Sequence, residues 1–345
     1  MKPIYLTAFP DSTTEAAWHE CLGDSDFASH YTAPEFFLEP YFKDRQFAVL
    51  AMEGPRVEGI LTGVFNGNVA DSGLGVRPQL CLRRSANVAE TCDTLVRGLL
   101  EHAQSNVQLL SLYSWIKLPS LRERGFRERE CSADAGTILL DLTKGHDALF
   151  KQFSETRRNK IRRALKAGVE VVELTSDEDF ETYYEIYKDW CHFKELPVLS
   201  HEMQKAAFEL KNNRLVLLAK HEGRVIGAST FRYCKGGIVE YAANVSRREE
   251  TKVRQNDLLL WKGIEWSSQQ GFKIFSMAGA HFFLQKFGGS IHTTYGYRLD
   301  RSLFRRHNMY DFLMESRNNM YRRLPEKMRE TLKARLSKQP GSGEN

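Results

Sequence analysis

The chain has 345 residues, and because one hydrophobic core rarely extends over so many, we expect two domains. Its composition, with 42% hydrophobic and 27% charged residues, is typical of a soluble globular protein. No apolar run approaches the roughly 20 residues that span a bilayer, and no signal-peptide core follows Met1, so we expect a cytoplasmic protein without a transmembrane segment. The six cysteines form no C-x-x-C pair and have no closely spaced histidine partners, so neither a disulfide scaffold nor a zinc site is predicted.

The net charge of +5 is unevenly distributed along the chain. Residues 151–170 hold seven Lys or Arg against two Glu, and residues 298–338 hold twelve against five acidic residues. Two basic segments on an otherwise acidic chain suggest a polyanionic ligand, such as a phosphate, a nucleotide diphosphate or RNA. The alternative is that both segments are solvated helix faces.

Apolar periodicity and turn residues predict helices, then a hairpin, then a helix and a strand in each half of the chain. The first half is expected to contain a helix at Thr14–Cys21, a hairpin of strands at Phe47–Met52 and Val57–Phe65, a helix at Val88–Gln104, and strands at Val107–Tyr113 and Thr137–Leu142.

The second half is expected to open with a helix at Asp147–Ala167, closed by Gly168 as a C-terminal cap. After it we expect a strand at Val169–Leu174, helices at Asp177–Phe193 and His201–Leu210, a hairpin within Arg214–Val245, a helix at Asn256–Gln270 and a strand at Lys273–Met277. The C-terminal part is predicted to form two short basic helices between Met309 and Leu336, with disorder at Gln339–Asn345.

An internal repeat supports this division into halves. The stretch Leu50–Thr62 recurs without a gap 168 residues later. Its identical positions are Leu50 and Leu218, Ala51 and Ala219, Arg56 and Arg224, Val57 and Val225, Gly59 and Gly227, and Thr62 and Thr230. A later match, at an offset of 165, pairs Leu95, Gly98 and Ser111 with Leu260, Gly263 and Ser276. A repeat this long exceeds that of a solenoid and indicates two copies of one domain, with chance similarity of two hairpins as the alternative.

The order of elements in each half is that of an α+β fold on a mixed sheet. It resembles the GNAT (acyl-CoA N-acyltransferase) fold, in which a splayed pair of central strands admits the acyl donor. Three segments resemble the Fem family of peptidyltransferases, which duplicate a GNAT-like unit: the basic segment Ser154–Val169 with its Arg-Asn-x-Ile core, His30–Phe36, and Phe283–Gly289 followed by Tyr295–Arg298. The resemblance implies duplicated GNAT-like domains, which we place at residues 1–142 and 143–300, with basic helices and a disordered tail at 301–345.

Fem enzymes move an amino acid from aminoacyl-tRNA onto a cell-wall precursor. The resemblance therefore implies an acyl- or aminoacyl-transferase that acts on an amine of a phosphate-bearing cell-envelope or polysaccharide precursor. The donor would be aminoacyl-tRNA or an acyl thioester of coenzyme A or an acyl-carrier protein, and no tightly bound cofactor is expected. tRNA is then a candidate partner, and the sequence leaves the oligomeric state open.

The chain departs from these families in three places. Acetyl-CoA-dependent GNAT enzymes hold pyrophosphate in a glycine-containing loop at a helix N-terminus, whereas Ser246–Leu258 contains no glycine, which argues against acetyl-CoA binding in the second half. The long helical-hairpin insertion of some Fem enzymes has no room here, so the likeness is to compact members. Those carry a Phe-Lys pair where this chain has Phe283 and Leu284, with Lys286 two residues later, which weakens the aminoacyl-tRNA interpretation.

The resemblance also implies roles for individual residues. Thr156 and Arg158 match positions that contact the acceptor's phosphates, and Arg suits bidentate phosphate binding. Most of the neighbouring basic residues are expected to be solvated or to meet RNA phosphate. Tyr241 matches a substrate-contacting tyrosine, and Phe283 fits the phenylalanine of the Phe-Lys pair.

Acyl transfer to an amine needs a positioned amine, relief of its proton and stabilisation of the carbonyl oxyanion. Glu240 precedes Tyr241 on a predicted strand and points to the opposite face, where it could relay a proton. Lys286 could hold developing negative charge or the terminal phosphate of tRNA. We therefore take Glu240, Tyr241 and Lys286 as candidate catalytic residues. Further candidate substrate contacts are His281, Lys43 and Asp71, and an ordinary structural role is the alternative for each.

Two hypotheses of different class follow. One is a transferase with a phosphate-bearing acceptor bound between the domains, which should show a polar cleft beside Tyr241 and Lys286. The other is a non-catalytic tandem-GNAT module that binds RNA or another polyanion. It should show a continuous basic surface that joins Arg157–Lys166 to Arg322–Lys338.

Overall fold

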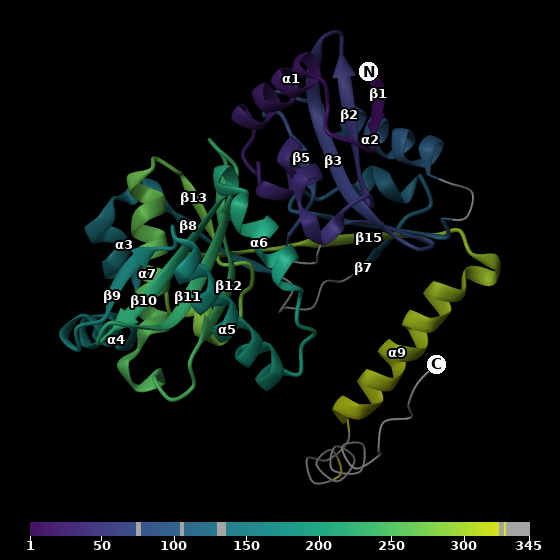
Figure 1. The fold of residues 1–345 in the computed structure, drawn as a ribbon. Coiled ribbons are helices and arrows are strands. Elements are labelled where there is room, and N and C mark those ends of the chain that lie inside the picture. Colours follow the sequence, from purple (N-terminus) through teal and green to yellow (C-terminus); the bar gives the residue numbers. More distant parts are fainter. Residues whose placement is uncertain (74–76, 104–106, 130–135, 324–327, 329–345) are drawn as a thin grey trace. The chain divides into compact units, whose positions relative to one another are not determined.

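A computed structural model describes residues 1–73, 77–103, 107–129, 136–323 and 328. The chain divides into a compact unit, Met1–Leu299, and a second unit, Asp300–Asn345. The first unit contains two mixed sheets with their helices, which we call the first and second lobes (Figure 1). Both predicted GNAT-like domains fall within this unit, and the boundary between residues 142 and 143 stays a prediction.

The first lobe is built on a sheet that pairs β2 with its hairpin partner β3 and continues through a parallel pair, β4 and β6. The strand order is β1 (Lys2–Leu6), β2 (Gln46–Glu53), β3 (Arg56–Asn66), β4 (Val69–Ser72), β6 (Leu109–Ser114), β15 (Tyr295–Asp300) and β7 (Arg127–Arg129), with β5 (Leu80–Leu82) paired to β3. The helices are α1 (Ser12–Gly23) and α2 (Val88–His102), and three short 3-10 helices lie between α1 and β2: η1 (His30–Thr32), η2 (Pro34–Leu38) and η3 (Pro40–Phe42).

The second lobe repeats this plan. Its strand order is β14 (Ser290–His292), β8 (Thr137–Asp141), β13 (Ile274–Ser276), β12 (Ile238–Ser246), β11 (Arg224–Tyr233), β10 (Arg214–His221) and β9 (Glu170–Glu173). Its helices are α3 (His146–Gln152), α4 (Glu155–Lys166), α5 (Asp177–Lys194), α6 (His201–Glu209), α7 (Gln255–Gln269) and α8 (Phe282–Gln285). Helices α4 and α7 pack on one face of the sheet, and α5 packs on the other.

The two hairpins are equivalent in register, which confirms the duplication. Ala51 pairs with Gly59 and Met52 with Val57, so that the strand bulges by one residue at this step. Ala219 pairs with Gly227 and Lys220 with Val225, which places the same bulge 168 residues later. A bulge bends and twists the strand locally, so both copies share a shape as well as a sequence.

The lobes exchange strands. Strand β8 follows β7 in the chain but pairs with β13 and β14 of the second lobe. Strand β15 follows β14 but lies between β6 and β7 of the first lobe, where it appears in Figure 1 as a yellow-green strand beside blue elements. Neither sheet is complete without a strand from the other half of the chain.

One predicted helix is wrong. The stretch Asp147–Ala167 forms two helices, α3 and α4, which are separated at Phe153 and Ser154. Phe153 adopts an extended backbone and is buried in the core, and the Arg158 side chain donates to its carbonyl oxygen. The sequence pattern continued through this break because both helices carry apolar residues on the same side.

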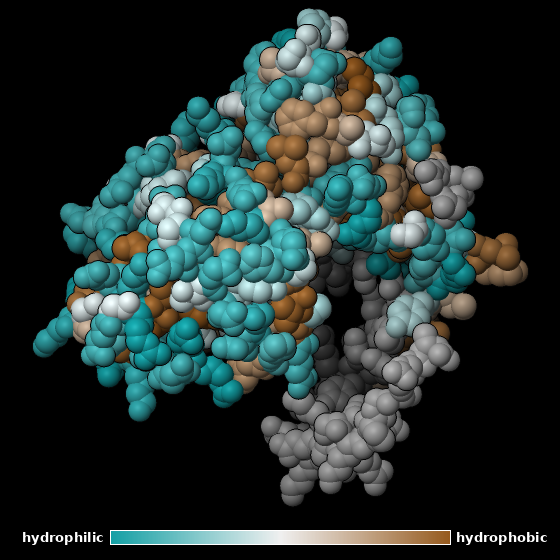
Figure 2. All heavy atoms as spheres, in the orientation of Figure 1, coloured by the Kyte–Doolittle hydropathy of each residue, from teal (hydrophilic) through white to brown (hydrophobic). Residues whose placement is uncertain are grey.

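The helices of the described residues were also compared with the length and apolarity that a membrane span needs. No helix of the described ranges is long and apolar enough to cross a bilayer. In the view of Figure 2, hydrophilic side chains cover most of the second lobe. The described part of the second unit contains η9 (Leu303–Arg305) and α9 (Arg306–Arg323), and α9 overlaps the start of the segment Met309–Leu336 in which two short helices were predicted. Most of the rest of that segment, and the predicted disordered segment 339–345, lie outside the described residues.

A glycine in α7 allows this helix to approach its sheet closely, and we predict that Gly263→Ala destabilises the protein. A Cβ at position 263 would lie 2.1 Å from Cζ of the fully buried Phe231, so the ring must move. We expect a loss of about 1–3 kcal/mol in the free energy of unfolding, measured by urea denaturation. Gly23→Ala, whose Cβ meets no atom within 4 Å, is the control and should change that free energy by less than about 1 kcal/mol. Equal effects of the two substitutions would contradict the close packing.

Candidate active site

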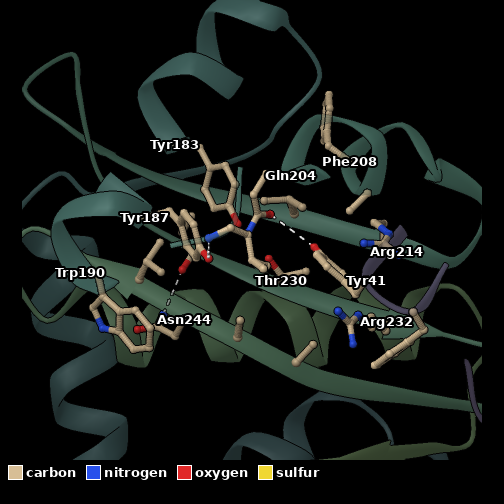
Figure 3. A pocket seen from close by; sticks show the side chains of 18 residues that line it. Tyr41, Tyr183, Tyr187, Trp190, Gln204, Phe208, Arg214, Thr230, Arg232 and Asn244 are labelled. Atoms are coloured by element: carbon tan, nitrogen blue, oxygen red, sulfur yellow. Dashed lines mark hydrogen bonds between the residues drawn. The ribbon is translucent and has the colours of Figure 1, made fainter. Parts of the chain in front are cut away.

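A cavity of about 330 Å³ lies on the α5 face of the second sheet, where segment η3 of the first lobe meets it. Its aromatic walls come from both lobes, and Figure 3 shows them around the opening: Tyr41, Tyr183, Tyr187, Trp190 and Phe208. Strands β11 and β12 form the floor with small residues such as Ala228 and Ala242. Such a cavity, with apolar walls and few polar groups, has the size and lining of a small-molecule site.

Helix α5 supplies one wall because of its residue spacing. Tyr183, Tyr187 and Trp190 are separated by four and three residues, which places them on one face of a helix. The Tyr187 hydroxyl accepts a hydrogen bond from the Leu199 amide at 3.1 Å, and Tyr184 donates to the Leu199 carbonyl at 3.0 Å. These bonds hold the segment between α5 and α6 against the wall, so the cavity is preformed.

One end of the cavity is bordered by two arginines of the second sheet, Arg214 and Arg232 (Figure 3). Arg214 forms an ion pair with Glu39, and the His30 Nε2 lies 2.6 Å from the same carboxylate. Burial alone would favour a protonated Glu39, but the contact with His30 and the charges of Arg232 and Arg214 lower its pKa to about 2. Burial lowers the pKa of His30, so its imidazole is neutral and Glu39 is ionised.

A second buried pair joins the lobes beside the first. The Arg77 Nε donates to Glu240 Oε1 at 2.7 Å, and the Tyr31 hydroxyl lies 3.4 Å from the same oxygen. Arg232 donates to the Tyr31 hydroxyl and stands over the rings of Tyr31 and Tyr41 at 5.7 and 5.5 Å. Tyr31 therefore links Arg232 to the Arg77–Glu240 pair.

The charges of this cluster do not balance. Its cations are Arg77, Arg214 and Arg232, and the carboxylates that face them within the described ranges are Glu39 and Glu240. Each carboxylate is paired with another arginine, so Arg232 carries the surplus positive charge. Among the described residues, the Arg232 Nε–H has no hydrogen-bond partner. Arg232 is half-buried, and its unmatched charge beside a cavity makes it a candidate contact for an anionic ligand.

At the corresponding positions of the first lobe, the described residues are packed. Its equivalents of Ala228 and Arg232, 168 residues earlier, are Ile60 and Val64, both buried in apolar clusters. The acidic position is shared: Asp71 is paired in register with Ser111 on β6, and Glu240 with Ser276 on β13. Where the first lobe has the apolar side chains of Ile60 and Val64, the second lobe has the small Ala228 and the charged Arg232 beside a cavity.

The predicted phosphate contacts gather at the junction of α3, α4 and α8, away from the cavity lining. Thr156 is exposed, and Arg158 donates to the carbonyl oxygens of Lys151, at 2.9 Å, and Phe153. The Lys286 ammonium lies 4.3 Å from the centre of the Phe282 ring, and its carbonyl oxygen accepts from the Ser154 amide at 2.9 Å. Their roles in binding an acceptor stay predictions.

Other predicted residues are distributed over three places. His281 is exposed and stacks with Phe283, which lies under the guanidinium of Arg157 at 4.0 Å. Tyr241 packs against Phe231, on the side of the sheet opposite the cavity. Lys43 ends η3 with an exposed side chain. The cavity lining includes none of Glu240, Tyr241, Lys286 and Lys43, but Glu240 is joined through the Tyr31 hydroxyl to Arg232, which lines the cavity.

Arg157 is buried, although most basic residues of this segment were expected to be solvated. It forms an ion pair at 2.5 Å with Asp257, a buried residue in the first turn of α7. The residues at the cavity's charged end that sequence reasoning missed are Glu39, Arg77, Arg214 and Arg232. One signal could have found two of them: Arg214 and Arg232 lie at the ends of the apolar stretches of β10 and β11. No group of three His, Cys, Asp or Glu side chains in the described ranges could hold a metal ion.

Comparison with solved structures identifies the fold of the chain. Neither protein-family models nor curated protein sequences match the chain. Among solved structures, FemX is 12% identical over 87% of this chain and 98% of its own, with a TM-score of 0.68. A tandem GNAT protein from the clavulanic acid biosynthesis pathway is 14% identical over 88% and 99%, with a TM-score of 0.55. L-PGS from Bacillus licheniformis is 13% identical over 86% and 93%, with a TM-score of 0.54.

The chain has the tandem-GNAT fold of FemX. The predicted α+β architecture of duplicated GNAT-like units is thereby confirmed, and the predicted resemblance to the Fem family holds at the level of the fold. The charged cavity lies in the second GNAT-like lobe, on strands that continue the duplicated hairpin. At these identities the likeness concerns the fold, and activity has to be argued from the cavity.

The charge surplus predicts which arginine is dispensable for stability. Arg214→Met leaves the buried Glu39 without its ion partner and should cost about 3–5 kcal/mol in the free energy of unfolding. Arg232→Met leaves two balanced ion pairs and should cost less than about 1.5 kcal/mol, mainly lost packing. Arg224→Met, an exposed position on the same strand as Arg232, is the control. Urea denaturation measures all three, and equal losses for Arg214→Met and Arg232→Met would contradict the charge assignment.

A second prediction concerns pH and the first lobe. Burial raises the pKa of Asp71 from 3.8 to about 6, although Arg298 opposes this shift. Because the folded-state pKa is raised, ionisation costs stability: the protein is most stable, as far as this group is concerned, below about pH 4, and that stability is lost as the pH rises through 6. The advantage of Asp71→Asn over wild type should therefore grow by roughly 1–2 kcal/mol from pH 4 to pH 7, allowing for solvent screening.

Urea denaturation at a series of pH values measures this difference. Asp147→Asn, whose carboxylate is 92% exposed, is the control and should stay parallel to wild type. A constant difference between Asp71→Asn and wild type over this range would show that Asp71 ionises normally in the folded state.

Proposed function

We propose that the protein is an acyl- or aminoacyl-transferase that acts on an amine, and that the amine-bearing end of its anionic acceptor binds in the cavity between the lobes. The observation that carries this proposal is the aromatic-walled cavity with a surplus cation at one end. A core that served stability alone would fill such a space with apolar side chains, as Ile60 and Val64 do in the first lobe. The shared fold of FemX and the tandem GNAT protein supports transferase chemistry.

The split between two central strands offers a place for the acyl donor. Strand β12 pairs with β13 only as far as Glu240 and Ser276, and continues from Tyr241 to Ser246 without a described strand partner on that side. In the GNAT fold the donor enters between such strands. We propose that the acyl arm lies along this edge, next to the part of β12 that lines the cavity, so that donor and acceptor meet at one strand.

The start of α7 is unsuited to the pyrophosphate of acetyl-CoA. A helix N-terminus attracts anions, but the first turn of α7 already contains the carboxylate of Asp257, paired with Arg157. The preceding loop has Arg254 in the left-handed region at φ 66°, where acetyl-CoA enzymes have glycine-rich backbone. The proposed donor is therefore an aminoacyl-tRNA or an acyl thioester whose carrier is held elsewhere.

The catalytic roles follow from the contacts of Glu240 and Tyr31. Arg77 and Tyr31 hold the Glu240 carboxylate next to Arg232, which lines the cavity, and we propose that Glu240, through the Tyr31 hydroxyl, positions Arg232 to orient the acceptor. A proton relay by Glu240 stays a prediction. Tyr241 and Lys286 stay candidates for contact with the donor. A phosphate on a cell-envelope or polysaccharide precursor would then meet the basic face near Thr156, Arg158 and Lys286.

Filling the cavity tests the proposed function. Ala242→Phe places a ring in the space that the acceptor would occupy and should lower transfer at least about 100-fold by displacing the amine. The assay measures, by mass, the transfer of an acyl or aminoacyl group to nucleotide-sugar and amino-acid acceptors. The donors are acetyl-CoA, acyl-carrier protein and aminoacyl-tRNA. Ala16→Phe, which adds the same ring to an exposed position of α1, is the control and should retain wild-type transfer.

The binding-module hypothesis makes the opposite prediction. If the wild type transfers no group from any donor, while RNA binds with equal affinity to wild type and Ala242→Phe, the protein is a polyanion-binding module. Arg157, at one end of the predicted basic surface, is buried, and most of residues 322–338 lie outside the described ranges, so that surface stays a prediction.

A further inference from the structure

We propose that the cavity recognises a carboxylate on a small apolar or aromatic molecule, and that Arg232 selects for that carboxylate. This inference rests on the proposed function, because in the transfer reaction the molecule would be the amine-bearing acceptor or the end of one. It names a ligand class, an amino acid or peptide end that carries a single carboxylate, that differs from the phosphate to which the sequence pointed.

The first argument is that Arg232 has unused donors. Its guanidinium contacts the Tyr31 hydroxyl and two tyrosine rings, and it pairs directly with no carboxylate of the described chain. The Nε–H is buried without an acceptor among the described residues, and so is that of Arg214 beside it. Guanidinium groups bind carboxylates through two parallel hydrogen bonds, so a carboxylate at this end of the cavity would give Arg232 the anionic partner that the described chain does not supply.

The second argument is the size of the surplus charge. Three guanidinium groups face two carboxylates, and His30 is neutral because burial lowers its pKa. A single negative charge neutralises the cluster. A phosphate monoester carries about −1.5 to −2 charges at pH 7, so binding one here would bury excess negative charge. The cluster therefore matches a carboxylate better than a phosphate.

The third argument is the rest of the cavity. Away from the arginines, the walls are the rings of Tyr187 and Trp190 and the aliphatic side chains of Leu199 and Val245 (Figure 3). These surfaces favour an apolar or aromatic body of the ligand. At about 330 Å³ the cavity is at the lower end of the range for ligand sites, which suits an amino acid or the end of a peptide but not a nucleotide-linked precursor as a whole.

Between the two ends, the side-chain amide of Gln204 and the hydroxyl of Thr230 also line the cavity. Gln204 accepts a hydrogen bond from Tyr41 at 3.3 Å, which fixes its orientation across the lobes. An amine on the ligand would lie along β12, whose backbone borders the cavity at Ala242 and Ala243. This places the amine at the strand on which we propose that the donor binds.

The test is direct binding of matched probes by isothermal titration calorimetry, without any donor. The probes are 3-phenylpropionate, its uncharged analogue 3-phenylpropanamide, and phenyl phosphate. Wild-type protein should bind 3-phenylpropionate at least about 10-fold more tightly than either of the others. Arg232→Gln should reduce 3-phenylpropionate affinity to that of the amide and leave the amide unchanged, whereas Arg224→Gln, exposed on the same strand, should change neither.

Several results would overturn the proposal. They are equal binding of the acid and the amide to wild type, tighter binding of phenyl phosphate, a preference for the acid that survives Arg232→Gln, and no saturable binding of 3-phenylpropionate below about 10 mM. The wild-type comparison needs no variant, so the test stands even if Arg232→Gln fails to fold. Carboxylate binding without transfer from any donor would count against the proposed function alone. Transfer in which Arg232→Gln leaves the acceptor's KM unchanged would count against this inference alone.

Discussion

Three guanidinium groups and two carboxylates meet at the junction of the two lobes, where Arg214 and both carboxylates are buried and Arg77 and Arg232 are half-buried, and the rest of the functional argument depends on this imbalance. Both ion pairs cross between the lobes: Glu39 with Arg214, and Arg77 with Glu240. Because breaking either pair would leave a buried charge uncompensated, the lobes are held in one relative arrangement within the first unit. The exchanged strands β8 and β15 add to this constraint, since each sheet is completed by the other half. A rigid junction of this kind can keep a cavity open and a cation unpaired for a ligand.

The duplication shows how such a site can arise from an apolar core. The two hairpins keep the same bulge, and the helices α2 and α7 each carry a glycine that lies close to the sheet, Gly98 and Gly263. What differs is the face of the sheet that α1 covers in the first lobe and α5 covers in the second. The first lobe fills it with apolar side chains, whereas the second has a small residue, Ala228, and the charged Arg232. At these positions the first lobe has a packed apolar core, and the second has a cavity.

Much of the fold could be read from the sequence, because hydrophobic periodicity and the 168-residue repeat are local or self-comparing signals. The hairpins, α1, α2, α5 and α7 lie within a few residues of the predicted positions. The sequence did not predict the break between α3 and α4 or the strand exchange, because both depend on tertiary contacts. Arg158 donates to the carbonyl of Phe153, and β15 pairs with strands far from it in the sequence. The cavity escaped for the same reason. Glu39 and Arg214 are 175 residues apart, and a pattern within one chain does not show which buried charges face each other.

The most direct test of the central claim is where and how a carboxylate ligand lies. A crystal structure of the protein with 3-(4-bromophenyl)propionate locates the bromine by its anomalous scattering, independently of any fitted orientation. We predict one bromine peak beside Tyr187 and Trp190, with the carboxylate in contact with Arg232 at the opposite end of the cavity. A bromine peak next to Arg232, or peaks only outside the cavity, would contradict the assignment of the unpaired guanidinium to an acidic ligand.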